Sequence, residues 1–486
     1  MGIPRFLRAR KETPKSGLGR SVSEQLIWKN TDSLVPGSLR VSPNSRRVAF
    51  LKLEEYQVSP FTMIDAGWMV IDGKFEDAYQ RAQAPVFSPD SKRVAYAAVK
   101  IGTFGPSLDW SVIVDGEEVG RHTFAFDEEE GGISIHRITH DPIIYDLMFS
   151  PNSQRLAYVV QRGDKQLVVV DGVEGEKFDH IFRGIFFSPN SERTAYLASA
   201  KQGLGYVLVL DGKKEEIKAD IIEPASLAFS PDGKRFAYVA RKDQKWFLIL
   251  DGASLKEYDE IITSPIFSPD SQRLAFVARQ GSKYFAVIDG AESEKYDFMC
   301  SPPVFSPDCR RMAYRGEQDD REVVVIDGEA NGEFDPVGKG VLSLSLIFSP
   351  DSKRVAYSAH RDGKVLVVVD GKQEGPYNSV YSLVFSHDSR QVGYTAVRNS
   401  IHFVVLNGEG RTNYDEVREG VIFSPGSRLY AYVGARANKA YVVVNGLEGK
   451  PWNKIVGPPV FDDSQGLHYV ALRAKSLYLV EDSVAL

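Results

Sequence analysis

Residues 266–299 read IFSPDSQRLAFVARQGSKYFAVIDGAESEKYDFM, and this stretch holds each of the features that recur along the chain. It opens on Phe-Ser-Pro-Asp, a group that favours a turn because proline presets its own backbone angle while Ser and Asp side chains cap nearby amides. Two apolar runs follow, and the second ends at Asp289-Gly290, a pair that tolerates the positive backbone angles of a tight hairpin. The stretch therefore predicts short β-strands joined by tight turns.

The pattern recurs with a period of about 38 residues, within the range typical of repeat architectures. The Phe-Ser-Pro-Asp anchor, or a close variant of it, begins at Val41, Phe87, Phe149, Phe187, Phe229, Phe267, Phe305, Phe348, Phe385, Phe423 and Phe461. The third strand of a unit ends in Asp-Gly or Asn-Gly, at Asp72, Asp115, Asp171, Asp211, Asp251, Asp289, Asp327, Asp370, Asn407 and Asn445. A fourth strand carries an aromatic residue followed by Asp or Asn, as in Tyr258-Asp259. Four antiparallel strands per unit predict the blade of a β-propeller.

We predict an all-β fold, a β-propeller of ten or eleven four-stranded blades over residues 25–486. The last anchor, at Phe461, is followed by enough residues for two strands only, whereas residues 25–41 resemble the end of a unit, with Trp28 in place of the usual Tyr. The two ends of the chain are therefore expected to complete one shared blade, which removes exposed edge strands. The lack of a Pro/Gly/Ser-rich linker between units favours a single large ring, and two tandem propellers are the alternative.

The sequence FSPDSKRVAY at 348–357, followed by VVVDG at 367–371, resembles the WD-like propeller repeats of the TolB type. It is also similar to the propellers of prolyl-oligopeptidase-like enzymes. The resemblance covers roughly residues 41–480 and implies a propeller fold and a bacterial source, but little about function, because propellers host many unrelated activities. The chain lacks the Gly-x-Ser-x-Gly sequence and the α/β region of such hydrolases, so only their propeller is resembled.

Composition narrows the classes of function. A net charge of −6 and a pI near 5.9 disfavour a protein that coats nucleic acid, so no nucleic-acid partner is expected. No apolar stretch reaches the roughly 18 residues of a membrane helix, and no secretory signal is seen, which favours a cytoplasmic protein, or a periplasmic one if a leader was removed. Residues 1–24 form a basic arm, expected to be flexible and suited to docking an acidic partner. The two cysteines, Cys300 and Cys309, are expected to be packed thiols.

The candidate site is an insertion around residues 117–146, where the interval between anchors is longest. It contains Arg121, His122, Asp127, Glu128, Glu129, Glu130, His136 and His140. Imidazole and carboxylate groups are normal metal ligands, but their spacing matches no defined metal motif, so we predict a partner-binding hairpin and no metal or cofactor. A second irregular segment, residues 53–73, supplies Trp68, which is assigned to the same partner-binding surface.

An arginine recurs six residues after the anchor, at Arg47, Arg93, Arg155, Arg193, Arg235, Arg273, Arg311 and Arg354. A ring of arginines could attract anions to a channel, but an ion pair with a turn aspartate is the expected role. The sequence thus predicts a non-catalytic scaffold for protein–protein interaction, a subunit or accessory of a larger bacterial assembly. One alternative is a ligand-binding, metal-binding or hydrolytic propeller that uses its central channel and the insertion. The other alternative is a TolB-like envelope factor.

Overall fold

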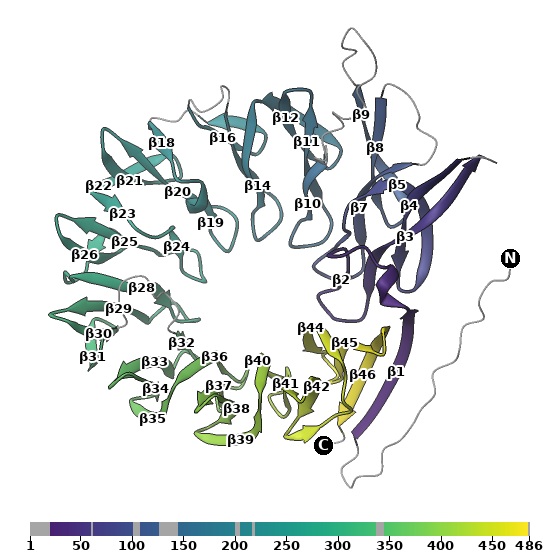
Figure 1. Ribbon diagram of the computed structural model, residues 1–486. Helices are drawn as coiled ribbons and strands as arrows, with labels where there is room; N and C mark the ends of the chain where they lie inside the picture. The colour runs from purple at the N-terminus through teal and green to yellow at the C-terminus, as the bar shows by residue number, and fades with distance from the viewer. Residues whose placement is uncertain are drawn as a thin grey trace.

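The computed structural model describes residues 20–59, 62–100, 107–125, 144–199, 205–215, 219–336 and 345–484. Apart from two 3₁₀ turns, η1 (Thr31–Ser33) and η3 (Pro224–Ser226), the elements within these ranges are β-strands. The strands form ten hydrogen-bonded sheets, which follow one another in chain order around a central opening (Figure 1). The predicted all-β, propeller-like fold is confirmed.

Most sheets contain four strands in sequence order, and in two sheets the first strand is split into two short pieces. One sheet consists of β10 (Ile144–Phe149), β11 (Leu156–Arg162), β12 (Lys165–Val170) and β13 (Val173–Phe178). The next consists of β14 (His180–Phe187), β15 (Thr194–Ser199), β16 (Val207–Leu210) and β17 (Lys213–Glu215). A third consists of β28 (Phe298–Phe305), β29 (Met312–Gln318), β30 (Arg321–Ile326) and β31 (Glu329–Phe334). The two sheets with a split first strand consist of β18 (Ile221–Ile222), β19 (Ala228–Phe229), β20 (Phe236–Lys242), β21 (Lys245–Leu250) and β22 (Ala253–Tyr258); and β23 (Glu260–Ile261), β24 (Ile266–Phe267), β25 (Leu274–Gln280), β26 (Lys283–Ile288) and β27 (Ala291–Glu292).

Three further sheets complete the regular series. They consist of β32 (Leu346–Phe348), β33 (Val355–Arg361), β34 (Lys364–Val369) and β35 (Lys372–Tyr377); β36 (Ser379–Phe385), β37 (Val392–Arg398), β38 (Ile401–Leu406) and β39 (Glu409–Tyr414); and β40 (Glu416–Phe423), β41 (Tyr430–Arg436), β42 (Lys439–Val444) and β43 (Leu447–Glu448). The predicted turns have the expected geometry, since Asp289 and Gly290, between β26 and β27, have φ angles of 51° and 85°.

The first sheet has eight strands and combines two repeats. Its strands are β2 (Arg40–Val41), β3 (Val48–Ser59), β4 (Thr62–Ile71), β5 (Lys74–Ala82), β6 (Val86–Phe87), β7 (Val94–Lys100), β8 (Ser107–Val114) and β9 (Glu117–Ala125). Strand β5 pairs with β4 up to Tyr79 and with β7 from Tyr79 onward. It therefore ends one four-stranded half and begins the next.

The last sheet joins the two ends of the chain. It is formed by β44 (Lys454–Phe461), β45 (Leu467–Arg473), β46 (Ser476–Val484) and β1 (Arg20–Lys29). Trp28 pairs with Leu477, and this is the position that Tyr258 takes opposite Trp246 in another sheet. The prediction that the two ends of the chain share one blade is therefore confirmed. The boundary differs from the prediction: β1 begins at Arg20, which places residues 20–24 in the strand and not in the basic arm. The remainder of that arm, residues 1–19, lies outside the described residues.

The core lies between the sheets. Buried apolar side chains form eleven clusters in the described part of the chain, and ten of them combine residues from two sheets, or sheet halves, that follow each other in order. One of the clusters contains Ile27 and Val470 of the last sheet together with Val48 and Val70 of the first. The first and last sheets thus pack against each other, and the described sheets bury both of their faces, as the apolar middle strands require.

Both ends of the predicted insertion, around residues 117–146, lie in strands of the sheets. Residues Glu117–Ala125 form β9, which pairs with β8, and Ile144–Phe149 form β10 of the next sheet. Residues 126–143 lie outside the described residues. Both cysteines are free and buried, as predicted. Within the described ranges, we find no helix with the length and apolar character needed to cross a bilayer.

Candidate interaction surface

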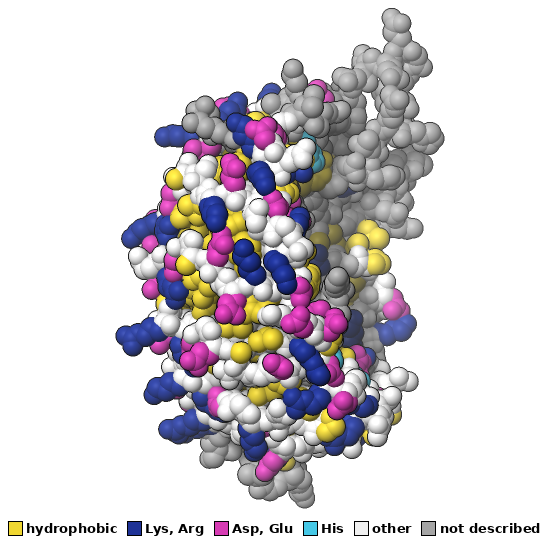
Figure 2. Space-filling model, turned by 90° about the vertical axis from the view of Figure 1, so that its left-hand side faces the viewer, with side chains coloured by type: hydrophobic (Ala, Val, Ile, Leu, Met, Phe, Trp, Pro, Cys, Tyr) yellow, Lys and Arg dark blue, Asp and Glu magenta, His cyan; other side chains and the backbone are white. Residues whose placement is uncertain are grey.

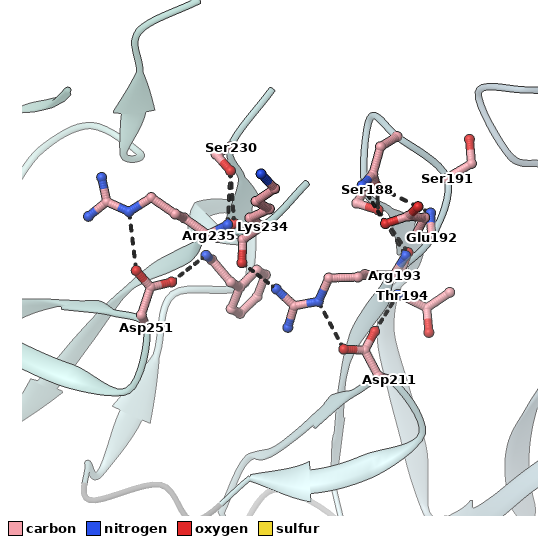
Figure 3. A network of polar contacts seen from close by, with 12 residues as sticks. Ser188, Ser191, Glu192, Arg193, Thr194, Asp211, Ser230, Lys234, Arg235 and Asp251 are labelled. Carbon is pink, nitrogen blue, oxygen red and sulfur yellow. Dashed lines mark hydrogen bonds and ion pairs between the residues drawn. The ribbon is translucent and has the colours of Figure 1, made fainter. Parts of the chain in front are cut away.

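The repeated arginines form ion pairs within their own sheets. Nε of each lies 2.7–3.2 Å from Oδ2 of the aspartate in the Asp-Gly turn, in the pairs Arg47–Asp72, Arg93–Asp115, Arg155–Asp171, Arg193–Asp211, Arg235–Asp251, Arg273–Asp289, Arg311–Asp327 and Arg354–Asp370. Figure 3 shows two of these pairs side by side, Arg193 with Asp211 and Arg235 with Asp251. The predicted ion pair between this arginine and a turn aspartate is confirmed.

The same arginines also reach the following sheet. Each guanidinium lies 5.1–5.7 Å from the centroid of the next anchor ring, in the pairs Arg47–Phe87, Arg93–Phe149, Arg155–Phe187, Arg193–Phe229, Arg235–Phe267, Arg273–Phe305, Arg311–Phe348 and Arg354–Phe385. In addition, Nη1 of Arg193 donates to the carbonyl of Lys234 at 2.9 Å (Figure 3). These contacts use the arginines to join sheets, so they do not form a free cationic surface.

The aspartate after the fourth-strand aromatic residue has a similar linking role. Asp259 accepts from Nζ of Lys245 at 2.5 Å and from the backbone amide of Gly281, in the next sheet, at 2.7 Å. The hydrogen bond from Lys245 lowers the pKa of Asp259. Basic and acidic side chains alternate over the outer side of the molecule on which such pairs lie (Figure 2). The repeated charges therefore stabilise contacts between strands and sheets.

The structure places two residues of the predicted site, Arg121 and His122, on β9. Arg121 is exposed and pairs with Glu118 at 2.8 Å. His122 is buried, with Nε2 3.0 Å from the hydroxyl of Tyr158 in the next sheet. His122 pairs with Trp110 in the same way as Phe178 pairs with Gln166 in the next sheet. His122 therefore takes the position at which that sheet has a buried aromatic side chain. Burial lowers its pKa. His122 thus contributes to the contact between two sheets and not to an accessible surface.

The other residues of the predicted hairpin, Asp127, Glu128, Glu129, Glu130, His136 and His140, lie outside the described residues. Across the described ranges, no group of three or more His, Cys, Asp or Glu side chains is arranged to hold a metal ion.

Trp68, the remaining residue of the predicted site, belongs to a cluster that we call the aromatic edge, formed by Trp28, Lys52, Trp68 and Phe75. The ring of Phe75 lies 5.3 Å from that of Trp28 and 5.5 Å from that of Trp68, both edge-on. Nζ of Lys52 lies 5.1 Å from the centroid of the Phe75 ring. Phe75 remains 47% exposed, which is unusual for a phenylalanine at the centre of a ring cluster. Four strands, β1, β3, β4 and β5, contribute to this surface.

The aromatic edge lies on the most irregular part of the fold. Strands β3 and β4 have 12 and 10 residues, whereas their counterparts β25 and β26 have 7 and 6. Their hairpin projects outward from the array of sheets (Figure 1). Lys52 and Trp68 pair at the register where Ala278 pairs with Phe285, so the aromatic edge lies at the base of this hairpin, within the regular part of the blade.

Sequence reasoning missed Phe75, although a signal for it was present. Phe75 pairs with Val70, and the residues at the same register of the other fourth strands are small or polar: Glu118, Glu174, Lys214, Ser254, Glu292, Ala330, Gln373, Gly410 and Glu448. Alignment of the fourth strands therefore identifies Phe75 as a bulky apolar residue at an otherwise outward-facing polar position.

The fold and the arrangement of its charged residues define a β-propeller repeat protein. No protein-family model matches the chain, and no curated protein matches its sequence. Among solved structures, the chain is similar to TolB from Acinetobacter baumannii, with 14% identity over 60% of this chain and 76% of that one and a TM-score of 0.26. It is also similar to the β-propeller domain of the Trilobed protease from Pyrococcus furiosus, with 18% identity over 53% of this chain and 93% of that one and a TM-score of 0.27.

A third similar structure is the Dos1 propeller, with 12% identity over 69% of this chain and 90% of that one and a TM-score of 0.30. Two of these three structures are described as propellers, the fold that was predicted from the repeats. The sheets and clusters described above define that fold independently of these likenesses.

Proposed function

We propose that the protein is a non-catalytic scaffold that binds a protein partner through its aromatic edge, as a subunit or accessory of a larger assembly. The bacterial source of that assembly is what the TolB-type resemblance implies. The observation that carries the proposal is the exposure of Phe75 between Trp28 and Trp68, at the base of the β3–β4 hairpin. Aromatic side chains dominate the binding energy of many protein interfaces.

We also infer that the body of this scaffold is one closed ring of eleven four-stranded blades. The inference is supported by the division of the eight-stranded sheet at β5, by the shared last sheet, and by the eleven core clusters between successive repeats. Two tandem propellers would instead require two separate closures, each with its own terminal contact. A ring of blades leaves only short, protected sheet edges, which limits pairing with strands of other chains.

The use of the repeated charges supports a scaffold over an enzyme. The eight arginines and their aspartates act between strands and sheets, and the burial of His122 removes it from solvent. These side chains hold blades together, whereas the ring of Phe75 leaves almost half of its surface in solvent. Such an exposed apolar side chain is retained most readily where a partner covers it.

The proposal is tested by affinity capture from the organism of origin with three tagged forms of the chain. They are the unmodified protein, Phe75→Asp, and Tyr381→Asp, which alters a ring that is 52% exposed on β36, away from the aromatic edge. We expect the unmodified protein and Tyr381→Asp to retain the same partner in equal amount, and Phe75→Asp to lose it while its melting temperature stays unchanged. Retention of that partner by Phe75→Asp would reject the aromatic edge as the binding surface.

A further inference from the structure

In four repeats an arginine covers the fourth-strand ring of the preceding sheet. The arginine is the seventh residue of the second strand, and its guanidinium lies 4.6–5.7 Å from the ring centroid, in the pairs Arg361–Phe334, Arg398–Tyr377, Arg436–Tyr414 and Arg473–Trp452. Two of these arginines also donate to the fourth strand of their own sheet. Nη2 of Arg436 donates to Glu448 at 3.0 Å. Nη1 of Arg361 donates to Gln373 at 2.9 Å. A ring, a guanidinium and a side-chain oxygen thus form a repeated contact between sheets.

The first repeat lacks this contact where it packs against Trp28. Glu54 stands at the seventh position of β3, where β33 has Arg361. Phe75 stands on β5 where β43 has Glu448, since each pairs with the penultimate residue of the third strand. The arginine and the oxygen that receives it are therefore both replaced, while the aromatic ring of the preceding sheet remains.

The first repeat also has a lysine at a position that is otherwise small or apolar. Lys52 is the fifth residue of β3, and the equivalent residues of the other second strands are Ala98, Val160, Ala198, Ala240, Ala278, Gly316, Ala359, Ala396, Gly434 and Ala471. Nζ of Lys52 lies 5.7 Å from the centroid of the Trp28 ring and 5.1 Å from that of Phe75. It also lies 3.0 Å from Oε1 of Glu54. The aromatic edge is thus arranged to accept a cationic group beside a carboxylate.

The carboxylate and the ring both remain accessible at this edge. The side chain of Glu54 is 51% exposed, and Phe75 is 47% exposed. Within the described part of the chain, Oε2 of Glu54 makes no hydrogen bond or ion pair. Glu448, by contrast, is 28% exposed and accepts from both Arg436 and Tyr414. The first repeat therefore presents an acid and an aromatic ring without the arginine that joins such groups in other repeats.

We propose that the aromatic edge binds an arginine side chain of the protein partner. Its guanidinium stacks on Phe75 and pairs with the carboxylate of Glu54, as Arg436 contacts a ring and an acid within the chain. Arginine suits this site better than lysine, because a planar guanidinium stacks on a ring while it donates to a carboxylate. This inference rests on the proposed scaffold function, which supplies the partner, and adds the chemistry by which that partner is recognised.

The test is a titration of the full chain with N-acetyl-arginine amide, followed by the indole NMR signals of its five isotope-labelled tryptophans. We expect a saturable shift of the Trp28 signal, which is identified with Trp28→Phe. N-acetyl-citrulline amide has nearly the same shape without the charge, so it should bind at least about fivefold more weakly. Equal binding of the two probes, or no shift of the Trp28 signal, would overturn the site.

Substitutions at Glu54 locate the bound guanidinium. Glu54→Gln should weaken binding of N-acetyl-arginine amide at least about fivefold, since it removes the charged acceptor. The control Glu329→Gln, at an exposed position of β31, should bind like the unmodified protein. Lys52→Ala should bind at least as tightly, because it frees the carboxylate of Glu54. Lys52→Ala with Glu54→Arg, which copies Ala359 and Arg361, should not bind, because an arginine of the chain then fills the site. Unchanged binding in Glu54→Gln or in the double variant would overturn the inference.

The titration and the affinity capture fail in different ways. Binding of N-acetyl-arginine amide without capture of any partner would reject the scaffold function and leave an arginine site. Capture that is lost in Phe75→Asp, but is kept both in Glu54→Gln and in the double variant, would reject recognition of an arginine and leave the scaffold function.

Discussion

Gln391 and Asn407 stand in the β36–β39 sheet where eight other repeats have an ion-paired arginine and aspartate. Oδ1 of Asn407 accepts from the amide of Val392 at 2.9 Å, and Nε2 of Gln391 donates to the carbonyl of Ser427 in the next sheet at 3.0 Å. Both charges are replaced together while both hydrogen bonds to the backbone are kept. The uncharged pair indicates that the hydrogen bonds, more than the charge, hold this position together.

We predict that the arginine matters more than its ion pair. Asp171→Asn should change the free energy of unfolding by less than about 1 kcal/mol, because partly exposed ion pairs contribute little. Arg155→Ala should cost more, about 1–2 kcal/mol, because it also loses the hydrogen bonds to Ser191 and Glu192 and the contact with Phe187. Thermal denaturation of both variants checks the order, and a larger loss in Asp171→Asn would contradict it.

Arg20 should be essential for closing the last sheet. It lies 2.5 Å from Asp482, and the side chains of the pair are only 7% and 0% exposed. It also donates to the carbonyl of Val442 in the preceding sheet at 3.1 Å. Arg20→Met leaves the carboxylate of Asp482 buried and uncompensated, at a cost of about 3–5 kcal/mol.

Truncation provides the control for Arg20. Deletion of residues 1–19 should leave the melting temperature unchanged, whereas deletion of residues 1–29 should lower it and cause aggregation, because β46 becomes an open edge. Equal stability of the two truncated proteins, measured by thermal denaturation and light scattering, would be incompatible with closure by β1.

The buried pair of Arg315 and Glu322 allows a test of whether a buried ion pair stabilises this protein more than apolar packing does. Nε of Arg315 lies 3.0 Å from Oε1 of Glu322, and both side chains are at most 1% exposed. Burial raises the pKa of Glu322. The equivalent residues of the preceding sheet are Val277 and Tyr284.

Arg315→Val alone should destabilise the protein by about 3–5 kcal/mol, because it leaves the carboxylate of Glu322 buried without a charged partner. Arg315→Val with Glu322→Tyr, which copies the preceding sheet, should restore the unfolding free energy or exceed it. A double variant as unstable as the single one would show that the pair itself stabilises the interface between the two sheets.

His122 should make stability depend on pH. Its pKa in the folded protein lies below the ordinary value of 6.5, because burial disfavours the imidazolium form. Below pH 6.5 the unfolded chain therefore binds a proton that the folded protein does not. The contribution of His122 to the free energy of unfolding is therefore complete above pH 6.5. It decreases as the pH falls toward the lowered pKa of the folded protein, by about 1.4 kcal/mol for each unit by which that pKa lies below the ordinary value.

His122→Phe, which restores the ring found at Phe178, should reduce the loss of stability between pH 7.5 and pH 5. The control is His180→Phe, because His180 is exposed on β14. Melting temperatures measured across this range check the prediction, and equal slopes for the two variants would contradict it.

The repeat could be predicted because its turn residues act locally. Asp289 and Gly290 specify a hairpin by their own backbone preferences, and the same pair recurs in most units. Contacts between segments that are distant in the sequence could not be predicted in the same way. Arg20 and Asp482 are 462 residues apart in sequence, and nothing near Arg20 distinguished it from the other basic residues of the arm.

The candidate sites show a different limit. His122 was assigned to a partner-binding hairpin because of its residue type, whereas its register matches that of a packed ring. Phe75 is the opposite case, since it is a common residue type at a position where the other repeats have a small or polar residue. Comparison of equivalent positions in the repeats, and not of residue types, would have identified it from the sequence.

Site-specific photocrosslinking at position 75 tests the proposed scaffold most directly. A photoreactive phenylalanine analogue is placed at position 75, or at the exposed position 381 as a control, in the full chain expressed in its organism of origin. If the aromatic edge binds a partner, irradiation yields one defined crosslinked protein from position 75 and none of that product from position 381. No product from position 75, or the same product from both positions, would contradict partner binding at the aromatic edge.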